Sequence, residues 1–235
     1  MATILCDLDG TLLVKTHRDP PDSPGPKRLA LNQALTEVCD CPGIDFVQGM
    51  VHGLTDWLIA ERAVQIHKPG FKLDGPTWQA VVGRAQAVFV PPASGAEPLY
   101  EKLPGIPETL IALKKAGHTL GIVTGNVAFF ALYKLDQVGL DRGLFNGPVG
   151  FGDHGREREH ILRLAMARSE DPAMVVLGDT VHDFAGAQKV GLPFLGTGSM
   201  GLEASELQLH PACWVADLAD AEAVIGAVES LSKVK

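Results

Sequence analysis

Two aspartates separated by one residue follow an apolar run near the amino terminus. The run is Thr3–Cys6, and the acids are Asp7 and Asp9, followed by Gly10. The apolar run predicts a short buried strand, and Gly10 predicts a turn just beyond it. Residues i and i+2 of a strand point to one face, so both carboxylates can face the same small volume. Carboxylates this close repel each other unless a cation or a shared proton relieves them, and oxygen ligands suit Mg²⁺. An ordinary turn after an edge strand is the alternative, because Asp and Gly are common turn residues.

A second apolar run ends in a hydroxyl group and is followed by a small flexible turn. This run is Thr119–Thr124, and Gly125 and Asn126 come next. A helix is predicted over residues 127–137, and the first turn of a helix presents unpaired N–H groups that bind phosphate. The Thr124 hydroxyl can add a hydrogen bond. A plain strand–helix loop, with Asn126 as the helix N-cap, explains the same residues.

Two arginines stand where another helix is predicted to begin. Arg156 and Arg158 precede the apolar-periodic residues 161–165. Cations at a helix N-terminus are unfavourable with respect to the helix dipole, and binding of a phosphate would explain their presence there. An exposed charged first turn, with Glu157 and Glu159 as partners, is an equal alternative.

A third apolar run also ends in acid. The strand predicted over Met174–Gly178 is followed by Asp179, and Asp183 lies four residues later, at the start of a helix that runs to Val190. These two carboxylates can reach a common metal ion. Capping is the alternative, with Asp179 or Thr180 as N-cap and Asp183 favouring the helix dipole.

Together these four stretches resemble the motifs of the haloacid dehalogenase-like hydrolase superfamily, specifically its phosphatases. Residues 7–11 match the first motif, D-x-D-G-T, and residues 178–183 match the fourth, G-D-x-x-x-D. Thr124 matches the strand-terminal Ser or Thr of the second motif. The usual K-P-x-P form of the third motif is absent. Arg158 is predicted to supply the third-motif cation, because its offset from the following apolar residues resembles a known variant, and Arg156 is the alternative.

The resemblance implies a role for each matched residue. Asp7 is expected to be the nucleophile, and Asp9 the general acid and then the general base. The implied Mg²⁺ ligands are Asp7, Asp9 through its backbone carbonyl, Asp179 and Asp183. The implied phosphate-binding residues are Thr124, Gly125, Asn126 and Arg158.

The order of predicted elements indicates an α/β fold with a Rossmann-like parallel sheet and an inserted helical module. Strands and helices alternate from about residue 105 onward, which is typical of a parallel sheet with helices on both faces. Between residues 15 and 100 three segments have helical periodicity, and the flanks at 19–26 and 91–95 are rich in turn formers. We therefore predict a core domain of residues 1–14 and 101–235, and an inserted domain of residues 15–100.

An insert at this position resembles the C1-type cap that closes over the active site in the superfamily. Residues 49–56 resemble the cap loop and helix start of phosphoglycolate-phosphatase-like members. Within this stretch His52 and Asp56 are candidates for reaching the leaving group. A structural role is the favoured alternative, with Thr55 capping the helix and Asp56 favouring its dipole.

Composition restricts the possible partners. A formal net charge of −8, with no basic run, argues against nucleic acid as a partner. No apolar stretch approaches the length of a membrane span. The 4 cysteines are too few for a disulfide framework, and no leader precedes the first strand, so a cytoplasmic protein is predicted.

The expected function is a magnesium-dependent phosphatase acting on a small phosphorylated metabolite, with phosphoglycolate as the leading candidate. A β-phosphoglucomutase-like phosphotransferase would keep both acids of the first motif. A 2-haloacid dehalogenase or a phosphonate hydrolase would lack the second acid, so Asp9 argues against both. A non-catalytic Mg²⁺-binding module is the alternative from another class. The substrate and the oligomeric state are left open.

Overall fold

The computed structural model describes residues 1–16, 24–92, 97–198, 205 and 210–233. The strands are β1 (Thr3–Cys6), β2 (Leu13–Lys15), β3 (Tyr100–Lys102), β4 (Thr119–Val123), β5 (Val149–Gly150), β6 (Met174–Gly178), β7 (Phe194–Thr197) and β8 (Trp214–Val215). The helices are α1 (Pro26–Cys39), α2 (Asp56–His67), α3 (Gly75–Val88), α4 (Glu108–Lys115), α5 (Ala128–Gln137), α6 (Arg158–Met166), α7 (Val181–Val190) and α8 (Ala221–Leu231).

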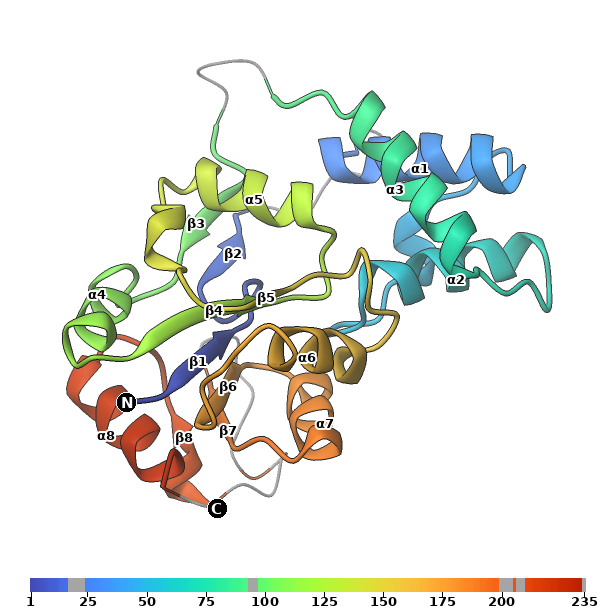
Figure 1. The fold of residues 1–235 in the computed structure, drawn as a ribbon. Helices are drawn as coiled ribbons and strands as arrows, with labels where there is room; N and C mark the ends of the chain where they lie inside the picture. The colour runs from blue at the N-terminus through green and yellow to red at the C-terminus, as the bar shows by residue number, and fades with distance from the viewer. Residues whose placement is uncertain (17–23, 93–96, 199–204, 206–209, 234–235) are drawn as a thin grey trace.

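A six-stranded parallel sheet forms the centre of the molecule, in the order β5-β4-β1-β6-β7-β8 (Figure 1). The α/β fold with a Rossmann-like parallel core is thus confirmed. Strands β1 and β6 have the predicted bounds. The short strands β2, β3 and β5 were not predicted, because two or three residues carry no readable alternation.

Helices cover both faces of the sheet (Figure 1), and the side chains of β1 show why its sequence is apolar after Thr3. Ile4 and Cys6 pack into the cluster that includes residues of α4, α5 and α8, whereas Leu5 packs on the opposite face against residues of α6 and α7. A parallel strand buried on both faces has no polar positions until it ends. The apolar run therefore ends where the strand does, and Asp7 is the first residue beyond it.

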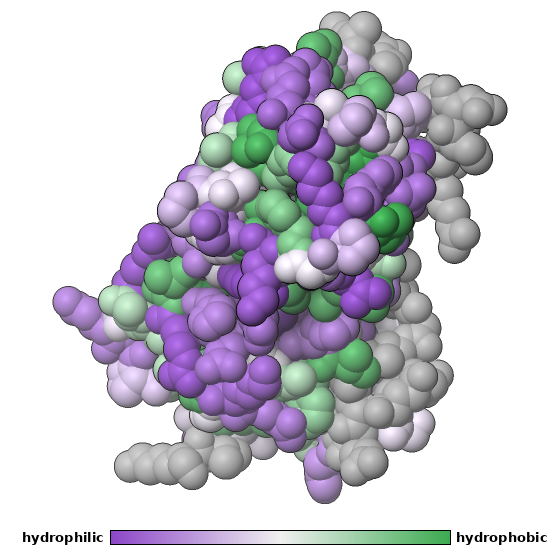
Figure 2. All heavy atoms as spheres, turned by 90° about the vertical axis from the view of Figure 1, so that its right-hand side faces the viewer, coloured by the Kyte–Doolittle hydropathy of each residue, from purple (hydrophilic) through white to green (hydrophobic). Residues whose placement is uncertain are grey.

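Helices α1, α2 and α3 form a separate helical group beside the sheet, here called the insert (Figure 1). Its core includes Trp57 and Trp78, whose rings stack with centroids 5.7 Å apart. Val127 and Phe130, at the start of α5, are buried in the same cluster. In Figure 2, which looks onto the insert side, hydrophilic residues predominate and hydrophobic ones form small scattered groups. The insert thus buries its core residues internally and against α5, whereas Leu29, Met50 and Ile66 stay exposed.

Strands β2 and β3 pair antiparallel and connect the sheet to the insert. Leu13 lies opposite Lys102, and Lys15 lies opposite Tyr100. The domain boundaries predicted at 14/15 and 100/101 fall inside this ribbon. The predicted turn-rich flanks fall partly on residues 17–23 and 93–96, which lie outside the described residues. The division into a core and a cap remains a prediction.

Two further sequence expectations concern the whole chain. Within the described part, no helix is both long and apolar enough to cross a membrane. Cys6, Cys39, Cys41 and Cys213 are free thiols, in agreement with the expectation of no disulfide framework.

Phe130 ties the insert to α5, and its truncation should be costly. The Phe130 side chain is 1% exposed, whereas its neighbour Phe129 is only partly buried. We expect Phe130→Ala to lower the free energy of unfolding by about 3–5 kcal/mol, through lost burial and the cavity left behind. Phe129→Ala is the matched control and should cost clearly less. Urea unfolding followed by circular dichroism measures both, and equal losses would contradict this packing.

Candidate active site

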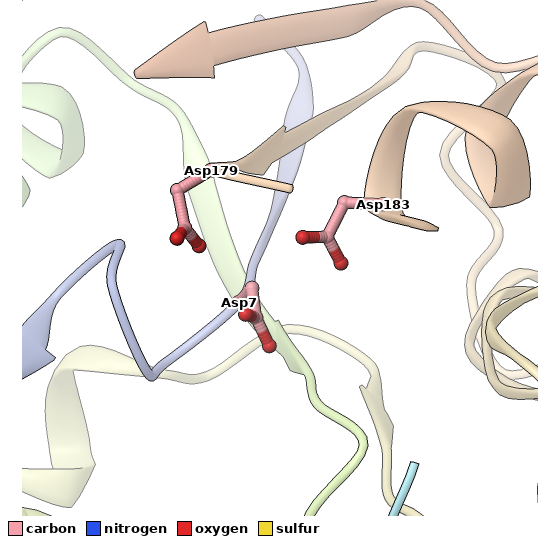
Figure 3. Close-up of side chains that lie close together, drawn as sticks. All are labelled: Asp7, Asp179 and Asp183. Carbon is pink, nitrogen blue, oxygen red and sulfur yellow. The ribbon is translucent and has the colours of Figure 1, made fainter. Parts of the chain in front are cut away.

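Three buried carboxylates meet at the carboxyl end of the sheet. Asp7 follows β1 and Asp179 follows the neighbouring β6, while Asp183 lies on the first turn of α7. The Asp7 N–H donates to the Leu177 carbonyl at 2.9 Å, which continues the β1–β6 register beyond the strand. One oxygen from each carboxylate lies within 4.8 Å of the others, and Figure 3 shows the three side chains converging. We call Asp7, Asp179 and Asp183 the acidic cluster.

The turn after Asp9 is shaped to fit against this cluster. Gly10 has φ +85°, and a Cβ atom there would lie 2.0 Å from Asp179 Oδ2. Any other residue at position 10 would therefore clash with the cluster and strain the backbone. Thr11 donates from its hydroxyl to Asp179 Oδ1 at 2.9 Å. The Gly-Thr pair of the first motif thus packs the loop onto Asp179.

Arg158 neutralises part of the charge of the acidic cluster. Its Nη1 donates to Asp7 Oδ1 at 2.9 Å, and its Nε lies 3.2 Å from Asp183 Oδ1. The Arg158 side chain is only 11% exposed. The alternative, Arg156, points elsewhere and donates to Glu61 of the insert at 2.6 Å. The structure therefore brings Arg158, and not Arg156, to the carboxylates.

Burial and mutual repulsion make Asp7 and Asp179 hold protons more tightly than ordinary carboxyls. Burial raises the pKa of Asp7 against the opposing effect of Arg158, and Asp183 adds to the rise. Burial also raises the pKa of Asp179, and the charges of Asp7 and Asp183 raise it further. In return the cluster raises the pKa of Arg158 above its usual value, against the effect of its burial.

The cluster has the donor set of a site for a hard divalent cation. All its ligand atoms are carboxylate oxygens, and Asp179 Oδ2 is buried without a hydrogen-bond partner. A buried unpaired oxygen costs free energy that a bound cation would recover. Asp183 also fulfils the capping alternative, because its side chain and that of Thr180 form a capping box at α7. Capping holds the Asp183 side chain in place and leaves Oδ1 directed toward the cluster.

Asp9 lies outside the acidic cluster and has different partners. Its carboxylate accepts hydrogen bonds from Lys134 Nζ at 2.7 and 2.6 Å, and from Asn126 Nδ2 at 2.6 Å. Burial raises the pKa of Asp9, but the charges of Lys134 and Lys27 and the bonds from Lys134 and Asn126 outweigh it, so the pKa is lowered. The two acids of the first motif therefore have opposite electrostatic environments.

Lys134 was missed by the sequence reasoning. It lies on the buried face of α5 with Phe130, Ala131 and Leu135, and its side chain is 5% exposed. A lysine at this helical spacing among apolar residues is the signal that could have found it, because a buried ammonium requires a partner.

The second motif forms a hydrogen-bonded loop around Asn126. Thr124 is buried, and its hydroxyl oxygen accepts from Asn126 Nδ2 at 2.9 Å. Asn126 is not the N-cap that the alternative predicted, since helix α5 is capped at Val127. The first amides of this helix already donate to carboxylates from other segments, Val127 N–H to Asp56 and Ala128 N–H to Asp153. Gly125 lies against the insert, where its carbonyl accepts from the Asp56 N–H at 2.8 Å.

The insert residues singled out from the sequence have mainly structural contacts. Thr55 caps α2 as predicted, and its hydroxyl also donates to the Arg156 carbonyl at 2.6 Å. Asp56 is buried, and its Oδ1 accepts from Lys27 Nζ at 2.7 Å while its Oδ2 accepts from the Val127 N–H. Both Asp56 oxygens are therefore occupied, which favours the structural alternative over contact with a leaving group. His52 is exposed and lines the cavity described next.

A cavity of about 360 Å³ lies between the insert and the end of the sheet. Its polar wall comes mainly from the sheet side and contains Asp7, Asp9, Asn126, Lys134 and Arg158. Its apolar wall comes from the insert and contains Phe46, Val47, Met50, Val51, Leu54 and Ile59. A pocket of this size and mixed lining is typical of a small-molecule site.

Sequence comparison assigns the chain to a family. The model of the family described as haloacid dehalogenase-like hydrolase matches residues 1–191, and the chain belongs to this family. The match contains the acidic cluster, Asp9, Thr124 and Arg158.

Individual relatives have low sequence identity to this chain. The chain is 27% identical over 146 residues to a phosphoglycolate phosphatase from Agrobacterium fabrum, covering 54% of this chain and 63% of the relative. It is 33% identical over 129 residues to a 5'-nucleotidase from Pseudomonas aeruginosa, covering 52% of this chain and 58% of the relative. The matches thus span less than two thirds of either relative. A hydrolase structure from Pseudomonas syringae has the same fold, with a TM-score of 0.58 at 19% identity over 94% of this chain and 95% of that one.

Metal binding should strengthen as pH rises. A protonated carboxyl cannot hold a cation, and the pKa values of Asp7 and Asp179 are raised to about 7 and about 8. Asp7 and Asp179 are therefore partly protonated below this range, and a metal must displace those protons. We expect the Mg²⁺ affinity, measured by calorimetry, to rise between pH 6 and pH 8 with proton release on binding. Asp179→Asn should weaken binding at both pH values. Affinity that is independent of pH would contradict the assignment.

Proposed function

We propose that this protein is a magnesium-dependent phosphoric monoester hydrolase that works through an aspartyl-phosphate intermediate. The observation that carries the proposal is the separation of two kinds of carboxylate at one cavity. The acidic cluster is suited to a cation, whereas Asp9, two residues from Asp7, is held apart by Lys134 and Asn126. Metal-assisted attack by Asp7 and proton transfer by Asp9 can then take place at the same cavity. Membership of the family and the phosphatase relatives support this reading.

Asp7 is the proposed nucleophile. Its carboxylate lies at the end of the central strand and lines the cavity. Attack on phosphorus forms the acyl phosphate and expels the alcohol oxygen of the substrate. In its protonated form Asp9 donates a proton to that oxygen, and in the second half-reaction the resulting carboxylate takes a proton from the attacking water.

The metal site would comprise Asp7, Asp179 and Asp183, together with the backbone carbonyl of Asp9. When bound, Mg²⁺ supplies positive charge that screens the attacking carboxylate from the phosphate dianion. Arg158 would share this role at the phosphoryl oxygens, since its guanidinium already lies on Asp7. The Thr124 hydroxyl and the loop at Gly125 and Asn126 would complete the phosphate site.

The leading substrate candidate is phosphoglycolate, named by one relative, within the broader class of small phosphorylated metabolites. A nucleoside monophosphate is the second candidate. The apolar wall of Phe46, Met50 and Val51 offers a surface for a ring, and the other relative is a 5'-nucleotidase. In this proposal the insert acts as a cap that covers the reacting groups and selects by the shape of the leaving group.

The alternatives differ in what happens to Asp9 and to the phosphoryl group. A mutase would return the phosphoryl group to a sugar, whereas a phosphatase transfers it to water. A dehalogenase would have no use for an acid at position 9. A non-catalytic Mg²⁺-binding module would need neither Asp9 nor the cavity.

Replacing Asp7 tests the nucleophile and the metal together. We expect Asp7→Asn to reduce hydrolysis of p-nitrophenyl phosphate to below about a tenth of wild type, because no acyl phosphate can form. Chelation of the metal in the wild type should have the same effect. Asp56→Asn is the matched control, because Asp56 is also a buried aspartate and its substitution affects the packing of the insert. Activity that persists in Asp7→Asn or with chelator would overturn the assignments.

The choice of substrate is tested with a panel assayed in Mg²⁺. We expect phosphoglycolate or a nucleoside monophosphate to have a higher kcat/KM than a phosphopeptide, because the insert covers the cavity. His52→Ala and Met50→Ala should change the ranking within the panel, since both line the cavity. A phosphopeptide that ranks first would rule out selection by the insert. Release of halide from a 2-haloacid, without phosphate release from any ester, would reverse the reaction class.

A further inference from the structure

Lys134 is a buried cation that belongs to none of the four motifs. Its ammonium donates to both oxygens of Asp9, at 2.7 and 2.6 Å, and to Asn126 Oδ1 at 2.8 Å. Its ammonium also lies 5.1 Å from the centroid of the Tyr100 ring. The lysine therefore reaches from the last turn of α5 to the loop of the first motif.

A buried lysine at this position lowers the stability of the fold unless its ammonium group has charged or polar partners. Burying an ammonium group is strongly unfavourable without partners, and a methionine of similar length would pack among Phe130, Ala131 and Leu135 without that cost. The carboxylate of Asp9, by contrast, is 41% exposed and could be hydrated without the lysine. The pair is thus a weak source of stability, and its main effect is to fix where the Asp9 carboxylate lies.

Asn126 extends the same restraint. Two ammonium groups, Lys134 and Lys27, donate to its Oδ1 at 2.8 and 2.7 Å. With the amide oxygen fixed on that side, Nδ2 must point the other way, and it donates to Asp9 and to Thr124. Asp9 is therefore held by a direct contact and by an amide whose orientation the same lysine sets.

We propose that Lys134 is a positioning residue for this reaction: it holds the Asp9 carboxylate, directly and through Asn126, in the wall of the cavity that receives the leaving group. This proposal rests on the proposed phosphatase function. Without the ammonium, the Asp9 side chain is free to rotate, and proton transfer to the departing oxygen becomes inefficient. Esters with poor leaving groups should suffer most, because they depend most on that proton.

The test compares two esters of similar shape. p-Nitrophenolate leaves readily without a proton, whereas phenolate leaves less readily and needs more help. We expect Lys134→Met to lower kcat/KM for phenyl phosphate at least about tenfold more than for p-nitrophenyl phosphate, since a general acid contributes about 10²–10⁴-fold. Lys134→Arg, which keeps a cation, should restore part of the difference.

A lysine with a purely structural role supplies the control. Lys114 on α4 also has three acceptors, the carbonyls of Gly143 and Leu144 and the side chain of Asn146. Lys114→Met should leave the ratio of the two kcat/KM values at the wild-type level. A double variant adds an independent check: Lys134→Met should cause little further loss in an Asp9→Asn background, because the residue it positions is already gone.

The outcomes separate this proposal from the phosphatase function. A wild type that hydrolyses neither ester in Mg²⁺ would overturn the proposed function. A wild type active on both, with equal losses for both esters in Lys134→Met, would overturn only the positioning role. An additive further loss in the double variant would do the same. If Lys134→Met does not fold, Lys134→Gln is measured in its place and the same shift in ratio is expected.

Discussion

The mutual repulsion of three buried carboxylates is the constraint on which the rest of the site depends. Asp7, Asp179 and Asp183 lie within reach of one another because β1 and β6 are adjacent parallel strands that end at the same level. Bringing these charges together out of water is unfavourable by itself. Arg158 offsets part of the charge, and Gly10 lets the first-motif loop pack directly against Asp179. The stability of the sheet thus supports a cluster that is primed for a cation.

Helix α5 connects three parts of the molecule that the site requires. Its first turn is capped by Asp56 of the insert, and its buried face places Phe130 in the core of the insert. One turn later the same face carries Lys134 to Asp9. Residues four apart on a helix lie on one face, so a single face meets both the insert and the first-motif loop. Packing of the insert is therefore mechanically linked to the residues around Asp9.

The two acids of the first motif differ because their neighbours differ. Asp7 has two other carboxylates and one arginine near it, and its pKa is raised chiefly by burial. Asp9 has a lysine and an amide, which lower its pKa despite its partial burial. Two residues of the same type, separated by one position, are thus suited to different chemical tasks. Divergent environments for paired acids are a recurring way of dividing catalytic labour.

The sequence by itself determined strands β1, β4 and β6, the order of the main elements and the four motifs, because a strand buried on both faces has a nearly uninterrupted apolar run that stops where the strand stops. It also showed that Asp7 and Asp179 stand at such ends and that Asp183 stands at the start of the following helix. It left Arg156 and Arg158 as alternatives, since two arginines separated by one residue at a helix start differ only in which side chains they contact in the folded protein. It could not show that the Asp56 carboxylate accepts hydrogen bonds from Lys27 and Val127. Nor could it show that Lys134 reaches Asp9 from 125 positions away. Such pairings depend on how helices pack on the sheet, which no local pattern of residues records, and only the tertiary structure decided them.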